Sequence, residues 1–141
     1  MAFHQEVNED RLSYRVIGVA IEVHSELGPG LSEAVYRDVL YEELEKSGLD
    51  ADRECVVPIE YRDRKVGERY LDLLVEDELV LELKVARSIT NKHLNQLGTN
   101  LRLANKRRGL VLNFGPPKLG IRRYINSHYC SGGAKERKAE S

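Results

Sequence analysis

The sequence lacks long hydrophobic runs, contains only two cysteines and has only two acidic residues from Lys84 to its end. No apolar stretch approaches the roughly 18 residues of a membrane span, and the N-terminal MAFHQEVNED has no signal-peptide core. We therefore expect a cytoplasmic protein without a membrane partner. Cys55 and Cys130 do not have metal-ligand spacing, which favours free thiols over a zinc site or a disulfide framework.

The missing acids create a charge asymmetry that the formal net charge of −1 conceals. Residues 1–83 hold nine Lys/Arg against 21 Asp/Glu, a balance of −12, whereas residues 84–141 hold 13 against two, a balance of +11. The acidic half can supply metal-binding carboxylates, and the basic half can supply cations for a polyanion. Two solvated faces that merely segregate would give the same counts. Because the sign changes at Lys84, close to the charged motif described below, we favour the functional interpretation.

The chain is long enough for one domain with an ordinary core, since 41% of its 141 residues are hydrophobic. We expect that domain over residues 1–130. A disordered tail is expected over residues 131–141, where Gly, Ser and charged residues replace apolar ones. No internal repeat is present.

Hydrophobic periodicity predicts an α/β fold. Helices are expected over about 10–27, 31–46 and 90–104, and strands over 55–61, 65–75, 79–85, 109–114 and 121–125. Pro58 indicates an edge strand or a bulge. The order is ααβββαβ(β), with a mixed central sheet flanked by helices. A crossover helix should place strand 109–114 parallel to strand 79–85.

Three charged residues interrupt the apolar strands of the segment YLDLLVEDELVLELK, residues 70–84. Charged side chains are seldom fully buried unless they are paired or bind a metal. Glu82 and Lys84 share one face, since they are two residues apart on a strand. If Val75 pairs with Leu79 across the turn, Asp72 lies opposite Glu82, with the two Cβ atoms about 5 Å apart.

Two carboxylates at that separation repel each other unless a proton or a cation lies between them. The hairpin is therefore predicted to bind a divalent metal. Oxygen ligands without Cys or paired His favour Mg²⁺ or Mn²⁺. A surface ion pair, with the hydrophobic residues facing inward, is the plainer explanation of an E-x-K triplet.

The pattern D-x₉-E-x-K of Asp72, Glu82 and Lys84, within a βββαβ order, resembles the PD-(D/E)xK nuclease superfamily. More narrowly, the segment GLSEAVY at residues 30–36 resembles the signature of the GxxExxY proteins, a bacterial group within that superfamily. The resemblance covers about residues 14–125, although Leu71 replaces the proline of the superfamily's name. It implies a restriction-endonuclease-like fold and metal-dependent hydrolysis of phosphodiester bonds.

The resemblance also implies roles for individual residues. Asp72, Glu82 and the carbonyl of Leu83 would hold Mg²⁺ or Mn²⁺, and Glu33 would add an acid directly or through a water. Lys84 would act on the attacking water, and Gln96 would approach that water or the scissile phosphate. Two plainer explanations stay open. The helix dipole alone favours an acid such as Glu33 at a helix start, and Gln96 could simply face solvent.

Five cations of the second half are the expected phosphate contacts: Lys92, Arg102, Lys106, Arg107 and Arg108. We expect the loop formed by the last three to lie close to the catalytic edge. Related proteins commonly read Q-x-x-x-Y from the position of Gln96, whereas this chain has Asn100 at the last place. Any contact that the tyrosine makes with nucleic acid is therefore altered here.

The leading hypothesis is a metal-dependent nuclease that acts on nucleic acid, with DNA favoured over RNA. The alternative is a catalytically silent module on the same fold that binds nucleic acid or a protein. A homodimer would place two sites on a duplex, but no residue indicates one. A Mg²⁺ titration beside a cleavage assay distinguishes the enzyme from the module.

Overall fold

The computed structural model describes residues 2–131, with side chains from residue 11 onward. The elements are α1 (Ala2–Leu27), α2 (Glu33–Lys46), β1 (Ala51–Tyr61), β2 (Arg64–Val75), β3 (Leu79–Lys84), α3 (Asn91–Ala104), β4 (Arg108–Asn113) and β5 (Gly120–Ile125). The predicted order ααβββαβ(β) is confirmed. Apart from Ser131, the expected tail lies outside the described residues. None of the described helices is long and apolar enough to cross a membrane.

The five strands form one mixed sheet in the order β1-β2-β3-β4-β5. Strands β1, β2 and β3 are antiparallel neighbours, β3 and β4 are parallel, and β5 is antiparallel to β4. The parallel pair follows from α3, because a crossover helix is needed to bring the chain back to the start of β3. The prediction for this pair is confirmed.

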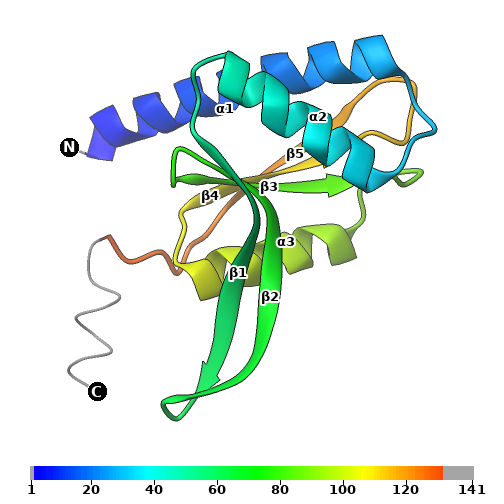
Figure 1. The fold of residues 1–141 in the computed structure, drawn as a ribbon. Coiled ribbons are helices and arrows are strands. Elements are labelled where there is room, and N and C mark those ends of the chain that lie inside the picture. Colours follow the sequence, from blue (N-terminus) through cyan, green and yellow to red (C-terminus); the bar gives the residue numbers. More distant parts are fainter. Residues whose placement is uncertain (1, 132–141) are drawn as a thin grey trace.

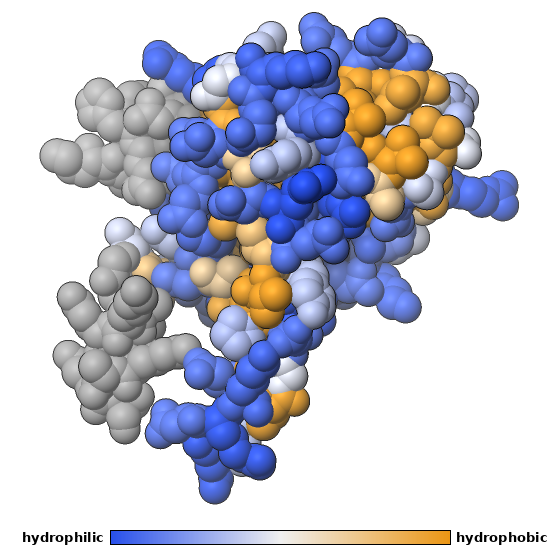
Figure 2. Space-filling model, viewed as in Figure 1, coloured by the Kyte–Doolittle hydropathy of each residue, from blue (hydrophilic) through white to orange (hydrophobic). Residues whose placement is uncertain are grey.

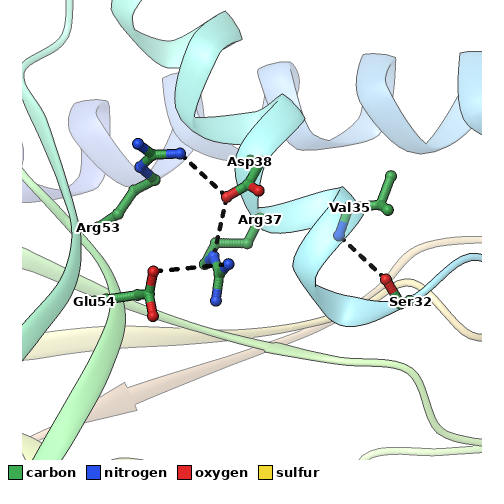
Figure 3. Close-up of polar contacts among 6 residues, drawn as sticks. All are labelled: Ser32, Val35, Arg37, Asp38, Arg53 and Glu54. Carbon is green, nitrogen blue, oxygen red and sulfur yellow. Dashed lines mark hydrogen bonds and ion pairs between the residues drawn. The ribbon is translucent and has the colours of Figure 1, made fainter.

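The sheet lies between α1 and α2 on one face and α3 on the other (Figure 1). Strand residues alternate between the two faces. Leu73, Leu81 and Leu83 pack under α1 and α2, whereas Val80 and Val111 pack under α3. Ion pairs hold α2 against β1: Arg53 lies 3.3 Å from Asp38, and Arg37 lies 3.8 Å from Glu54 (Figure 3).

Strands β1 and β2 form a long hairpin that projects beyond the rest of the molecule (Figure 1). The two strands pair over nearly their whole length, but only the last three residues of β2 pair with β3. Strand β1 is the edge of the sheet, with a register shift between Ile59 and Glu60. The edge position and the nearby bulge agree with the expectation drawn from Pro58, since proline has no N–H to donate to a neighbouring strand.

The turn between α1 and α2 is organised by Tyr36, which is fully buried. Its hydroxyl donates to the Gly28 carbonyl and accepts from the Leu31 N–H at 3.3 Å. Gly28 and Gly30 have φ of 73° and 102°, which favours glycine over residues with a Cβ. This turn sets the start of α2, and its residue Leu31 is exposed. An apolar patch covers this end of the molecule (Figure 2).

Candidate functional site

Strands β2 and β3 separate at Asp72. The ladder joins Leu73 to Leu81 and Val75 to Leu79, which is the register expected from the sequence. The ladder ends at the pair of Leu73 with Leu81. Beyond it, the Leu83 N–H donates to Asp72 Oδ2 at 2.8 Å, so the Asp72 side chain takes the place of a backbone acceptor on β2. The divergence of the hairpin therefore opens a gap in which Asp72 faces β3.

Glu82 lies beside Asp72 and is almost fully buried, with 7% of its surface exposed. Asn100 on α3, which is 3% exposed, donates from Nδ2 to Glu82 Oε1. The Oδ1 atom of the same amide accepts from the Nε–H of Arg69 on β2. One amide thus joins β2, β3 and α3, and because both of its polar atoms are used it fixes the orientation of the Glu82 carboxylate.

Burial and, after it, the negative charge of Asp72 raise the pKa of Glu82 to about 7. Donation from Asn100 and the charge of Lys84 oppose the rise in pKa. Two neighbouring carboxyl groups share a proton or hold a cation. The pair thus meets the electrostatic condition for a metal site.

The donor set fits a hard cation. Mg²⁺ in proteins usually binds one or two carboxylates and completes its sphere with waters and substrate phosphates. Among the residues with described side chains, no three His, Cys, Asp or Glu residues form a group able to hold a metal. Asp72 and Glu82 would therefore be the carboxylate ligands, which is sufficient for a site of this type.

Lys84 lies on the same face of β3 as Glu82. Its Nζ donates to Gln96 Oε1 at 3.3 Å, and both side chains are half-buried. Gln96 and Asn100 are one helical turn apart on α3, so one flank of the helix contacts Lys84 and Glu82 in succession. Gln96 therefore turns toward Lys84 rather than solvent.

Glu33 reaches the edge of the site from the other face of the sheet. Its Oε2 accepts from the Val85 N–H at 3.3 Å, one residue beyond Lys84. Glu33 does not join Asp72 and Glu82 in a cluster of three carboxylates. Its participation in metal binding, directly or through a water, stays a prediction.

The chain beyond Lys84 is clamped to the end of β4. Asn113 Oδ1 accepts from the N–H groups of Ala86 and Gly115 at 3.0 Å, and its Nδ2 donates to the Ala86 carbonyl at 3.0 Å. A Cβ at Gly115 would overlap the Ala86 carbonyl oxygen. The close approach of two backbones thus requires glycine here, and it holds the end of β3 in place.

The expected position of the basic loop is wrong. Arg108 pairs with Leu79 in the parallel ladder, whereas Asn113 pairs with Lys84. Lys106, Arg107 and Arg108 therefore lie at the start of β3, about 17 Å from Lys84 at about 3.3 Å per strand residue. Lys106 also pairs with Asp77 in the β2–β3 turn at 3.0 Å. The cause is the direction of α3, which carries the chain back to that end.

The other two predicted cations lie at opposite ends of α3. Lys92 is exposed in the first turn, at the catalytic end of the sheet, and Arg102 is exposed in the last turn. Their contact with nucleic acid stays a prediction.

Asn100 and Arg69 are the residues of the site that sequence reasoning missed. The available signal for Asn100 was its place four residues after Gln96, where related proteins carry tyrosine. A polar residue between the apolar positions Leu97 and Leu101 could have indicated a buried contact. Arg69 gave no comparable signal, because its neighbours on β2 alternate like those of any exposed hairpin.

Comparison with known proteins agrees with the fold. The family model that matches residues 10–124 is described as the PD-(D/E)XK nuclease superfamily. A solved structure titled "Crystal structure of SSO0001" has a TM-score of 0.55 at 18% identity and covers 76% of this chain. The chain spans 55% of that structure's length, and a likeness at this identity shows the fold alone. Comparison with curated proteins found no match.

Proposed function

The chain belongs to the PD-(D/E)XK nuclease superfamily, and on that premise we propose that it hydrolyses phosphodiester bonds of nucleic acid with a divalent metal, DNA being favoured over RNA. The observation that carries the proposal is the placement of Asp72 beside the end of β3, where its carboxylate accepts from the Leu83 N–H, with Glu82 and Lys84 on one face of that strand. Burial and mutual repulsion make the pair Asp72 and Glu82 costly without a cation.

Asp72 and Glu82 would hold Mg²⁺ or Mn²⁺. The carbonyl of Leu83 is the third proposed ligand: on a strand the N–H and C=O of one residue point to the same side, and the Leu83 N–H points to Asp72. When bound, the cation neutralises charge on the phosphate in the transition state. Glu33 would assist through a water from the other face.

Lys84 would orient the attacking water and stabilise negative charge as the phosphate becomes pentavalent. Its contact with Gln96 holds the ammonium group on the catalytic flank of α3. Gln96 has a second amide atom, Nε2, with which it can donate to the scissile phosphate or to the water. The two residues thus position the nucleophile side of the reaction.

We also propose that the chain belongs to the GxxExxY group. The described contacts support a division of labour within that motif. Tyr36 is buried and joins the turn at Gly28, whereas Glu33 faces the end of β3. The glycine and tyrosine of the motif would therefore place its glutamate. Cytoplasmic location and a homodimer remain predictions that the contacts do not address.

One observation favours a second function. The described residues form no three-carboxylate metal group, so a module that binds nucleic acid without turnover is the alternative. Mn²⁺ binding by calorimetry, together with complete absence of cleavage of single- and double-stranded DNA and RNA, would favour that module.

The test of the enzyme is Lys84→Ala. We expect cleavage to fall by at least about 100-fold, the usual contribution of one positioned acid–base group, while the Mn²⁺ affinity measured by calorimetry changes little. Lys118→Ala is the matched control, since it removes an exposed lysine between β4 and β5, at the same end of the sheet, that is not among the predicted phosphate contacts. Full activity of the Lys84 variant would contradict the mechanism.

A further inference from the structure

A polar groove of about 310 Å³ lies between α3 and the chain that includes and follows β5. Helix α3 contributes Asn95, Thr99 and Arg102, and the other wall contributes Tyr124, Ser127 and His128. These side chains offer a guanidinium, hydroxyls, an amide and an imidazole, all of which can donate hydrogen bonds. Among the residues that the structure describes, no carboxylate lines the groove. Its chemistry suits an anion with several acceptor oxygens.

The part of the chain that surrounds the groove is positively charged. From Lys84 to Ser131 the sequence contains ten Lys/Arg and no Asp or Glu. Within residues 11–131, none of the ion pairs involves Arg102. A negatively charged ligand therefore meets no like charge from α3, β4 or β5, and Coulomb attraction draws it to this side of the molecule.

The walls of the groove are built from fixed parts. Tyr124 packs over Gly98 so closely that a Cβ there would lie 2.6 Å from the tyrosine hydroxyl oxygen. Buried Asn126 donates to the Lys106 carbonyl at 3.0 Å and accepts from the His128 N–H at 2.9 Å. The segment that carries Ser127 and His128 is thus anchored before any ligand binds, which lowers the entropy cost of binding.

The groove and the catalytic pair lie on different flanks of α3, about 120° apart around the helix. Residues advance about 100° per position on a helix. Asn95, Thr99 and Arg102 therefore share one flank, whereas Gln96 and Asn100 share the other, facing Lys84 and Glu82. A strand that reaches both must cross the helix, whose diameter is about 10–12 Å. At about 3.4 Å per nucleotide along a strand, that distance corresponds to about three nucleotides.

We propose that the groove between α3 and β5 binds a backbone phosphate of the nucleic-acid strand about three nucleotides from the cleaved bond, with Arg102 as its principal cation. The inference rests on the proposed function, because it assumes that the ligand is nucleic acid. Contact there is to phosphate rather than to a base, so it adds affinity and positions the strand without reading its sequence.

The test measures binding of fluorescein-labelled 20-nucleotide DNA, single-stranded and duplex, by anisotropy in EDTA, so that no turnover occurs. Arg102→Ala should weaken binding about tenfold, the effect expected from one charged hydrogen-bonded contact. It should also lower the slope of log affinity against log salt by about one. Ser127→Asp, which adds a carboxylate from the other wall, should weaken binding similarly.

Arg123→Ala is the matched control. Arg123 is exposed on β5, next to Tyr124, so it points to the opposite face of the sheet, and its loss should change affinity less than about threefold. Thermal melts check that each variant folds.

If Arg102→Ala and Arg123→Ala lowered the DNA affinity equally, the result would contradict a phosphate site in the groove and favour diffuse electrostatic attraction. An affinity equal to that of the wild type in both Arg102→Ala and Ser127→Asp would also contradict the site. Binding and cleavage by the wild type would then leave the proposed function intact. A wild type that neither binds nor cleaves DNA or RNA would overturn both.

Discussion

At the scale of single residues, the site depends on the side-chain amide of Asn100, which hydrogen-bonds to two other residues at once. Asn100 donates to Glu82 and accepts from Arg69, so it links the predicted metal ligand to a cation on the neighbouring strand. An unpaired carboxylate in that buried position would be costly. Asn100 is therefore expected to act on the metal through Glu82, without contacting it.

The first prediction concerns Asn100→Leu. The variant leaves Glu82 without its donor and Arg69 without its acceptor, so the Mn²⁺ affinity measured by calorimetry should fall by about 10- to 100-fold, as for other residues that orient metal ligands. Asn95→Leu, on the exposed flank of α3 that lines the groove, should leave the affinity unchanged. An unaltered affinity in Asn100→Leu would show that Glu82 is oriented without the amide.

The second prediction concerns proton binding at Glu82 in metal-free protein. Burial raises its pKa from 4.5 to about 7 in the folded state, so the folded state binds a proton that the unfolded state releases between those pH values. The stabilisation is present in full below pH 4.5 and is lost as pH rises through about 7.

Urea unfolding in EDTA at several pH values from 4 to 8 tests this prediction. The free energy of unfolding of the wild type should fall relative to that of Glu82→Gln by up to about 3 kcal/mol across that range. The glutamine carries no titrating proton and serves as the reference. Parallel pH profiles for the two proteins would contradict a raised pKa.

At the scale of the elements, the catalytic end of β3 is set by what it packs against. Strand β2 diverges at Asp72, α3 supplies Asn100 and Gln96 on one flank, and Asn113 clamps the backbone after Lys84. Each element places only one or two side chains in the site, from its end or from one flank. A small backbone shift at this junction should therefore affect the site.

The third prediction is that Gly115→Ala destabilises the fold. The added Cβ meets the backbone of Ala86, which cannot move without breaking the Asn113 bonds, so the free energy of unfolding should fall by about 3 kcal/mol. Gly18→Ala on α1 is the control, because no atom lies within 4 Å of its Cβ position. In a helix interior it should raise stability by about 0.5–1 kcal/mol. Equal stability of the Gly115 variant and the wild type would contradict the clamp.

At the scale of the whole molecule, the two proposed ligands meet different regions. The metal pair lies at the junction of the acidic half with Lys84, and the acid-free region from Lys84 to Ser131 surrounds α3 and the groove beside it. Such a division lets the carboxylates attract a cation while the rest of that side attracts a polyanion.

The fourth prediction is that Mn²⁺ stabilises the folded protein. Asp72 and Glu82 are brought together only by the pairing of β2 with β3, so the unfolded chain has no comparable site. At 100 times the dissociation constant, the metal should raise the free energy of unfolding by about 2.7 kcal/mol. Asp72→Asn should lose this effect in thermal melts with and without Mn²⁺. A metal-independent wild-type melt would contradict the site.

The elements and the local register follow from the amino-acid sequence alone. Hydrophobic periods specify helices and strands, and a three-residue turn aligns Asp72 with Glu82 because strand pairing is counted from the turn. The D-x₉-E-x-K pattern also predicted the superfamily. These features depend on residues close together in the sequence or on one hairpin, so they can be predicted from a single sequence.

Which residues far apart in the sequence come into contact depends instead on how the elements pack. That packing placed the Asn100 amide between Glu82 and Arg69, turned Gln96 toward Lys84, and carried the loop 106–108 to the end of the sheet remote from Lys84. Those outcomes depend on where β2 diverges and how α3 crosses the sheet. Packing between elements sets both, because side chains far apart in sequence must fill the same space.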